Sequence, residues 1–225
     1  MDGTRIATGS VDKTARLWDA TNGNELMTLD QHRFYIDAVA FWENSSKLIT
    51  ATRGGPIKLW DLISGTEINH FREPARYGGG SGKLVLSKDA NLLAIVANYA
   101  GASYVDIWDM KSGNKRHKLE SDSGNLDAIF VGQSEYLAVV DAPRGTIGIW
   151  STKNWKQAES FKFVQVERVL FNKCLSVSNN GSLLAFPVGK DALLFDTAML
   201  FGGGGDPQSK PPTAVGTRNG LEPIL

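Results

Sequence analysis

Three histidines and one cysteine are the residues of this chain that most often bind metals or act as nucleophiles: His32, His70, His117 and Cys174. A transition metal needs ligand atoms about 2 Å from one point. His70 and His117 follow the preceding tryptophan by 10 (70−60) and 9 (117−108) residues, on expected outer strands that hold side chains far apart. Cys174 has no adjacent histidine to activate its thiol. We therefore expect no metal and no cofactor.

A glycine-rich stretch, Gly78–Lys83, could in principle cradle a phosphate. A P-loop would need glycine where Tyr77 stands, and serine or threonine where Leu84 stands. The stretch also leads into an expected strand, so the helix dipole that favours phosphate is absent. No nucleophile elbow, carboxylate dyad or nucleotide fingerprint follows elsewhere, and we predict that the chain is not an enzyme.

The elements that position these residues form a repeat. Five apolar segments end alike, in Leu17-Trp18-Asp19, Leu59-Trp60-Asp61, Ile107-Trp108-Asp109, Ile149-Trp150-Ser151 and Leu194-Phe195-Asp196. The aromatic positions are separated by 42 (60−18), 48 (108−60), 42 (150−108) and 45 (195−150) residues. Four-stranded propeller blades repeat every roughly 40 to 45 residues.

Apolar residues alternate before each aromatic residue, which predicts a strand with one buried face. Two further apolar runs precede each later aromatic strand, for example Ile36–Phe41 and Leu48–Ile49, and Glu25–Leu29 is typical of an outer strand. Gly23, Gly65 and Gly113 lie five residues after the aromatic, where a tight turn needs positive φ. Each unit thus holds four short strands, and the fold class is all-β.

The segment Gly9–Asp19 resembles the WD-repeat family, and the resemblance covers roughly the first two hundred residues. It implies a β-propeller over residues 1–201, with units at about 1–31, 32–72, 73–120, 121–162 and 163–201. Residues 202–225 are rich in glycine and proline, and we expect a flexible tail.

The resemblance also implies an incomplete propeller of about four to five blades. Asp2-Gly3 occupies the turn that normally follows an innermost strand, so the first unit lacks that strand, and the fifth unit stops after its third. Seven blades would need roughly 290 residues at this period. We expect an open arc, either a fragment or an array that another chain completes.

Members of this family carry a hydrogen-bond network of His, Ser or Thr, Asp and the Trp. Asp12 matches the Asp of the first unit, and His32 matches the His of the second, with Thr50 or Thr52 as its partner. The position of the Asp is taken in later units by Gly54, Ala102, Arg144 and Gly189. Because no unit has the whole network, we expect His32 to be partly exposed to solvent.

Composition excludes some partners. The chain has 24 Lys+Arg and 24 Asp+Glu residues, so no net field recruits nucleic acid or an anionic membrane. No apolar run has the length of a signal peptide or a membrane span. A single cysteine forms no internal disulfide, which indicates a reducing compartment, and we expect a cytoplasmic protein.

The function that remains is recognition of other proteins by a noncatalytic scaffold. The loops that enter the inner strands hold aromatic and arginine side chains, the usual binding anchors. We predict a partner-binding surface formed by Arg33, Phe34, Tyr35, Arg76, Tyr77 and Tyr99. The alternative is a ligand-binding or sensor propeller, or a propeller-class hydrolase, that uses the central channel. Asp37 and Asp127, at equivalent inner-strand positions, are the acids that such a channel would use.

Overall fold

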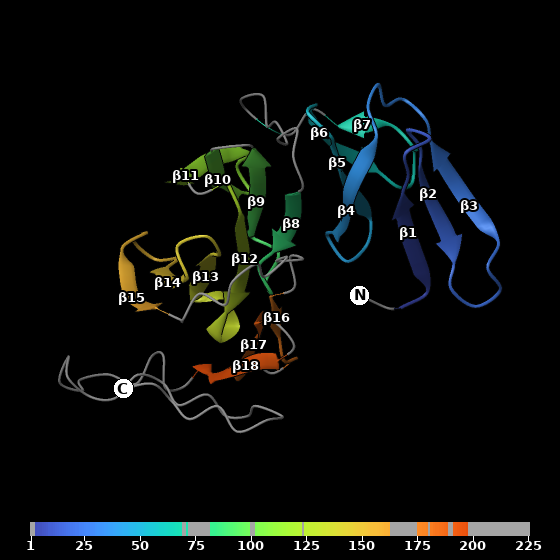
Figure 1. The fold of residues 1–225 in the computed structure, drawn as a ribbon. Coiled ribbons are helices and arrows are strands. Elements are labelled where there is room, and N and C mark those ends of the chain that lie inside the picture. The colour runs from blue at the N-terminus through green and yellow to red at the C-terminus, as the bar shows by residue number, and fades with distance from the viewer. Residues whose placement is uncertain are drawn as a thin grey trace. The chain divides into compact units, whose positions relative to one another are not determined.

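The computed structural model describes residues 3–68, 71, 82–99, 102–122, 124–162, 175–179, 181–188 and 191–197. The chain divides into two compact units, Met1–Gly124 and Asn125–Leu225. Within the described residues both units are built from antiparallel strands joined as meanders, which confirms the all-β prediction (Figure 1). None of the helical segments described there is long and apolar enough to cross a bilayer. The predicted tail, 202–225, lies outside the described residues.

The first unit contains three sheets. Blade 1 is β1 (Arg5–Gly9), β2 (Ala15–Asp19) and β3 (Glu25–Leu29). Blade 2 is β4 (Ile36–Trp42), β5 (Lys47–Thr52), β6 (Ile57–Asp61) and β7 (Glu67–Ile68). Blade 3 is β8 (Gly82–Leu86), β9 (Leu92–Tyr99), β10 (Ala102–Asp109) and β11 (Asn114–Ser121).

The second unit contains two sheets. Blade 4 is β12 (Leu126–Val131), β13 (Tyr136–Asp141), β14 (Thr146–Ser151) and β15 (Gln157–Lys162), with a short 3-10 turn, η1 (Gly132–Ser134), after β12. Blade 5 is β16 (Ser176–Val177), β17 (Leu183–Val188) and β18 (Asp191–Asp196). Among the described residues, blades 1 and 5 have three strands each.

The five aromatic endings are strand ends, as predicted. Strands β2, β6, β10, β14 and β18 end at Asp19, Asp61, Asp109, Ser151 and Asp196. In β2 and β14 alternate side chains are buried, Ala15 and Leu17 in the first strand and Ile147 and Ile149 in the second. The five sheets of the described residues therefore have the architecture of WD-repeat propeller blades.

The cores lie between neighbouring sheets. Fully buried Trp60 of blade 2 packs in one cluster with Ala15, Leu17 and Leu29 of blade 1. Fully buried Trp108 of blade 3 packs in the same way with residues of blade 2 that include Ile57 and Leu59. In the second unit, Ile147 and Ile149 of blade 4 pack on Leu184 and Phe186 of blade 5.

The turn after each aromatic strand has a repeated geometry. Gly23, Gly65 and Gly113 have φ of 76°, 70° and 68°, and each N–H donates to the carbonyl of the aspartate that ends the strand. Trp155, which takes the place of this glycine in blade 4, has φ of 56° and donates to the Ser151 carbonyl. The backbone of the turn is thus kept where the glycine is lost.

Asp109 shows what the aspartate contributes to this turn. Its Oδ1 accepts from the Ser112 N–H at 2.7 Å, and its Oδ2 accepts from Arg116 Nη2 at 2.6 Å. These bonds to Arg116 and Ser112 lower the pKa of Asp109 from its ordinary value of 3.8 to about 2. The pKa values of Asp19 and Asp61 are lowered for the same reason, chiefly by Thr21 and Ser64.

The register of blade 3 corrects one expectation. Ala102 does not lie in the turn that Asp12 occupies in blade 1, because it already belongs to β10 and pairs with Tyr99. Counting back a constant number of residues from the tryptophan fails here, because the β9–β10 hairpin has longer strands.

The same register explains a buried indole without an acceptor. Thr50 lies opposite Lys58, two residues before Trp60, and the residue opposite Asp106, two before Trp108, is Ile95. Trp60 Nε1 donates to the Thr50 hydroxyl, but the equivalent residue in blade 3, Ile95, has no hydroxyl. Trp108 Nε1 is therefore buried without an acceptor in the part of blade 3 that the structure describes.

Candidate protein-interaction surface

Three connections of blades 1 and 2 meet at one end of these sheets. They are the β1–β2 turn at 10–14, the β3–β4 connection at 30–35 and the β5–β6 turn at 53–56. The Ile36 N–H donates to the Ser10 carbonyl at 3.1 Å, and the Arg53 N–H donates to the Tyr35 carbonyl at 2.8 Å. The β3–β4 connection is thus hydrogen bonded to a turn on each side.

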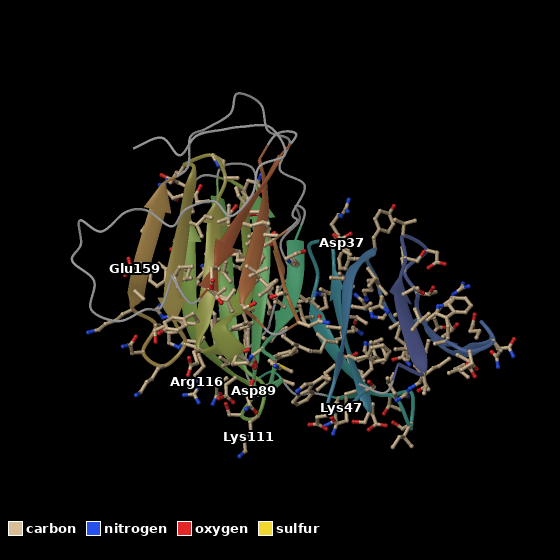
Figure 2. The ribbon with its side chains drawn as sticks, turned by 90° about the horizontal axis from the view of Figure 1, so that it is seen from below. Asp37, Lys47, Asp89, Lys111, Arg116 and Glu159 are labelled. Atoms are coloured by element: carbon tan, nitrogen blue, oxygen red, sulfur yellow. The ribbon has the colours of Figure 1, made fainter. Side chains whose placement is uncertain are left out.

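These connections carry a mixed apolar and charged patch, which we call the Phe34 surface: Val11, Lys13, Arg33, Phe34, Tyr35 and Arg53. Val11 is 71% exposed, Phe34 45% and Tyr35 47%. In Figure 2, Asp37 marks this end of blade 2, and Lys47 marks the opposite end of the same blade. The predicted anchors Arg33, Phe34 and Tyr35 therefore lie together on the surface.

Phe34 is positioned by Gly55, a residue outside the predicted set of anchors. A Cβ on Gly55 would lie 2.6 Å from Phe34 Cδ2 and 2.4 Å from Thr52 Oγ1, closer than atoms can approach. Only glycine at this position lets the phenyl ring lie against the β5–β6 turn. One side of the ring is therefore packed, and the remainder is open to a partner.

Buried His32 ties the connection to the body of blade 2. Its Nε2 lies 2.9 Å from Thr50 Oγ1, which also accepts from Trp60 Nε1 at 2.9 Å. His32 is 6% exposed, so the expectation of a partly exposed ring is wrong. The Trp60 ring, whose centroid lies 5.0 Å from that of the His32 ring, helps to cover the imidazole. His32 is therefore buried although Gly54 occupies the position of the aspartate in the family's hydrogen-bond network. Burial, and then the Lys58 charge, lower the pKa of His32.

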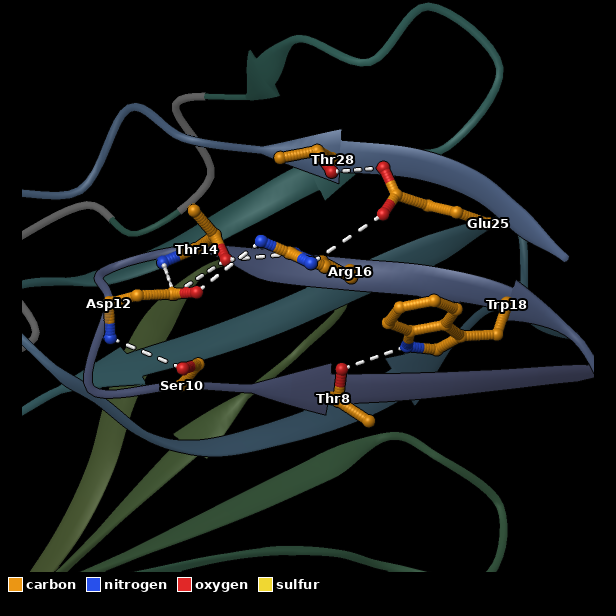
Figure 3. Close-up of polar contacts among 8 residues, drawn as sticks. All are labelled: Thr8, Ser10, Asp12, Thr14, Arg16, Trp18, Glu25 and Thr28. Atoms are coloured by element: carbon orange, nitrogen blue, oxygen red, sulfur yellow. Dashed lines mark hydrogen bonds and ion pairs between the residues drawn. The ribbon is translucent and has the colours of Figure 1, made fainter. Parts of the chain in front are cut away.

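Two acidic groups beside the surface, Asp37 and Asp12, already have partners. Both Asp37 carboxylate oxygens accept from Arg53, at 2.9 and 2.8 Å. Asp12 accepts from the Thr14 hydroxyl at 2.6 Å and lies 3.4 Å from Arg16 Nη2 (Figure 3). The Thr14 hydroxyl and N–H lower the pKa of Asp12. Lys13 and Arg33, in contrast, are exposed and have no ion-pair partner within the described residues.

The acids considered for a channel site have structural partners. Asp37 is held by Arg53 as above. Asp127 is buried, and it accepts from the N–H groups of Ala128 and Leu175 at 2.8 and 3.0 Å. Both carboxylates therefore have structural roles within the described residues.

Three further residues were predicted to bind the partner. Tyr99 is the last residue of β9 and does not belong to the connection after it, and its side chain lies outside the described residues. Arg76 and Tyr77 lie entirely outside the described residues. His70 and Cys174 also fall outside them, and His117 lies in β11. Among the side chains that the structure describes, no three of His, Cys, Asp or Glu are grouped to hold a metal ion.

Comparison with known proteins gives short and partial matches. The family model described as "WD domain, G-beta repeat" matches residues 1–19. A serine-threonine kinase receptor-associated protein of Gallus gallus is 27% identical over 161 residues, 72% of this chain and 43% of that protein. The Mus musculus protein of the same name is 39% identical over 138 residues, 61% of this chain and 37% of that protein.

A plant protein extends the comparison. Pre-mRNA-processing factor 19 homolog 2 of Arabidopsis thaliana is 24% identical over 208 residues, 74% of this chain and 39% of that protein. The chain therefore spans 37% to 43% of the length of these three relatives.

Proposed function

Because this chain belongs to the WD-repeat family, we propose that it is a noncatalytic scaffold that binds another protein through the Phe34 surface. The observation that carries this proposal is the exposure of Phe34 and Tyr35 on a connection that is hydrogen bonded on both sides. Partly exposed aromatic side chains on a rigid support are favoured as anchors, since little entropy is lost when they are covered.

The comparisons support a binding role without specifying the partner. The Gallus gallus relative is named for association with a serine-threonine kinase receptor, and the Arabidopsis relative for pre-mRNA processing. The chain covers less than half of either relative, so these names do not identify its partner. The engaged carboxylates of Asp37 and Asp127 favour the scaffold over a catalytic or ligand-binding channel.

The proposal is tested by replacing both aromatic anchors together. Phe34→Ala with Tyr35→Ala removes the apolar part of the surface while leaving the strands intact. Ile63→Ala is the matched control, because Ile63 is 88% exposed in the β6–β7 turn at the opposite end of blade 2. We expect the double variant to lose the proteins that the unchanged chain captures from its native cells, whereas the control retains them. Retention of every partner by the double variant would contradict the proposal.

We also propose that a further sheet covers the face of blade 1 that carries Trp18. The corresponding face of blade 2, with Trp60, is buried by Ala15 and Leu17. In blade 1, Ile6 is exposed and Trp18 is only half-buried, with its Nε1 donating to Thr8 Oγ1 at 2.9 Å (Figure 3). A blade with small apolar residues fits this face, whether it belongs to the same polypeptide or to a partner.

Thiol labelling tests this second contact. The variant Ile6→Cys places a thiol on the Trp18 face, and Cys174→Ser removes the native thiol. We expect a maleimide to react quickly with the isolated chain and slowly with the assembly purified from cells. Equal rates in both samples would show that nothing covers this face.

We propose a cytoplasmic location because the chain has a single cysteine and cannot form an internal disulfide. Fractionation of cells that produce the tagged protein at native level provides the test. Recovery in a secreted or organellar fraction would contradict it.

A further inference from the structure

We infer that the partner segment seated on the Phe34 surface is an acidic peptide with at least one large apolar side chain. The inference rests on the proposed function, and it adds the chemistry of the partner. It follows from three features of the surface: the balance of its charges, the shape of its apolar part and the rigidity of its backbone.

The charge balance favours carboxylates on the partner. Asp12 and Asp37 are each paired with an arginine, so they do not repel an acidic segment. Lys13 and Arg33 are exposed, and neither has an ion-pair partner among the residues that the structure describes. The β3–β4 connection has one other exposed carboxylate, that of Asp30. It directly follows the end of β3 and lies beside His32. Lysine and arginine side chains on a partner would therefore meet unfavourable charge at Lys13 and Arg33.

The apolar part selects a large side chain. Phe34 is supported by Gly55 on one side and is open on the other, and Tyr35 is next to it in the chain. Val11 projects from the β1–β2 turn, which is joined to the connection by the bond from Ile36 to Ser10. Leucine or phenylalanine from the partner would cover these groups and remove their apolar surface from water, which favours binding.

The backbone of the surface is already ordered before binding. The Ser10 carbonyl, the Arg53 N–H and the buried His32 hold the connection at three points. Little conformational entropy remains to be lost when a peptide docks, which suits a short extended segment. Two unpaired cations are too few to track a nucleic acid backbone, whose affinity depends on many phosphate contacts.

Fluorescence anisotropy with defined peptides tests the inference. The probe is a fluorescein-labelled decapeptide in which glutamates flank a Leu-Phe pair. One comparison peptide has lysine in place of every glutamate, a second has serine in place of Leu-Phe, and a single-stranded RNA of ten nucleotides is a third ligand. We expect only the acidic apolar peptide to bind, and its affinity to fall as salt rises.

Variants locate the binding and separate the two proposals. Lys13→Glu with Arg33→Glu is expected to weaken the acidic peptide at least tenfold and to allow binding of the lysine peptide. Lys111→Glu, an exposed cation in the β10–β11 turn, is the matched control and should change affinity less than twofold. The inference is overturned if the acidic peptide does not bind, if the lysine peptide or RNA binds the unchanged chain as tightly, or if the control weakens binding equally. The scaffold proposal survives any of these results provided that Phe34→Ala with Tyr35→Ala still abolishes capture of the cellular partner.

Discussion

The ammonium group of Lys115 lies 5.3 Å from the centroid of the Trp108 ring, the same distance that separates Lys58 from Trp60. The two lysines come from different strands, since Lys58 is in the aromatic strand β6 and Lys115 is in the outer strand β11. Lys58 pairs with Glu67 at 2.6 Å, whereas Lys115 pairs with Asp106 at 3.3 Å. The lysine of the pair thus lies in the aromatic strand in blade 2 and in the outer strand in blade 3, and the acid lies in the other strand. In both blades the lysine remains over the tryptophan ring.

This exchange predicts that the pair can be reversed. Asp106→Lys with Lys115→Glu reproduces the arrangement of Lys58 and Glu67, and we expect it to be more stable than either single variant. Asp106→Lys alone places two cations together in a buried site and should cost about 3 kcal/mol. Urea unfolding of the three variants measures the coupling. The control is Lys118→Ala, which breaks an exposed pair with Glu120 and should cost less than about 1 kcal/mol. Additive single effects would contradict the exchange.

The buried Thr50 hydroxyl is expected to stabilise blade 2 more than the corresponding Thr8 stabilises blade 1. Thr50→Val removes the partner of both Trp60 Nε1 and His32 Nε2 inside the core, at a cost of about 2 kcal/mol. Thr8→Val removes only the acceptor of the half-buried Trp18 Nε1, which water can replace, and should cost less than about 1 kcal/mol. Urea unfolding measures the loss of stability in each variant. Equal losses would show that the burial of the Thr50 hydroxyl and its bond to His32 add no stability.

The aromatic strands of blades 1 to 3 were predictable because two sequence signals agree at each of them. Alternation of apolar residues marks the strand, and the Trp-Asp pair with glycine five residues later marks its end, as at Trp60, Asp61 and Gly65. Hairpin length was not visible in the same way. A constant offset from the tryptophan assigned Ala102 to a turn, although hydrogen bonding extends β9 and β10 by several residues and makes Ile95 the counterpart of Thr50.

The interaction surface was predictable only in part. Phe34 and Tyr35 stand out in the sequence as adjacent aromatic residues in an expected loop. Val11, Lys13 and Arg53 belong to other turns, and only the pairing of the β3–β4 connection with both turns brings them to the same surface. The burial of His32 depends on the Trp60 ring above it, which is a tertiary contact that no local pattern contains.

Asp109 should make the stability of the first unit depend on acid. Its folded pKa of about 2 lies below the ordinary value of 3.8, so its contribution is complete above about pH 5 and is lost as the pH falls from about 4 to 2. At neutral pH we expect Asp109→Asn to lower the free energy of unfolding by about 1 to 2 kcal/mol. The difference between the variant and the unchanged chain should shrink at pH 3. In Arg116→Ala the free energy of unfolding should depend less on pH than in the unchanged chain, because the hydrogen bond from Arg116 is the main cause of the lowered pKa of Asp109. A difference that stays constant from pH 7 to pH 3 would show that the carboxylate is not specially stabilised.

Gly55 is expected to control binding without contacting the partner. In Gly55→Ala the new methyl group would lie 2.6 Å from Phe34 Cδ2, so the ring must leave the β5–β6 turn and capture of the partner should fall several-fold. Crowding of Thr52 Oγ1 in the same variant should also cost about 1 to 3 kcal/mol of stability. Gly23→Ala is the matched control for that loss, because its φ of 76° strains alanine while no atom lies within 4 Å of the new methyl group. Capture assays at a temperature where both variants stay folded should show weak binding by Gly55→Ala and normal binding by Gly23→Ala. If the two variants bind equally well, the position of the Phe34 ring does not determine recognition.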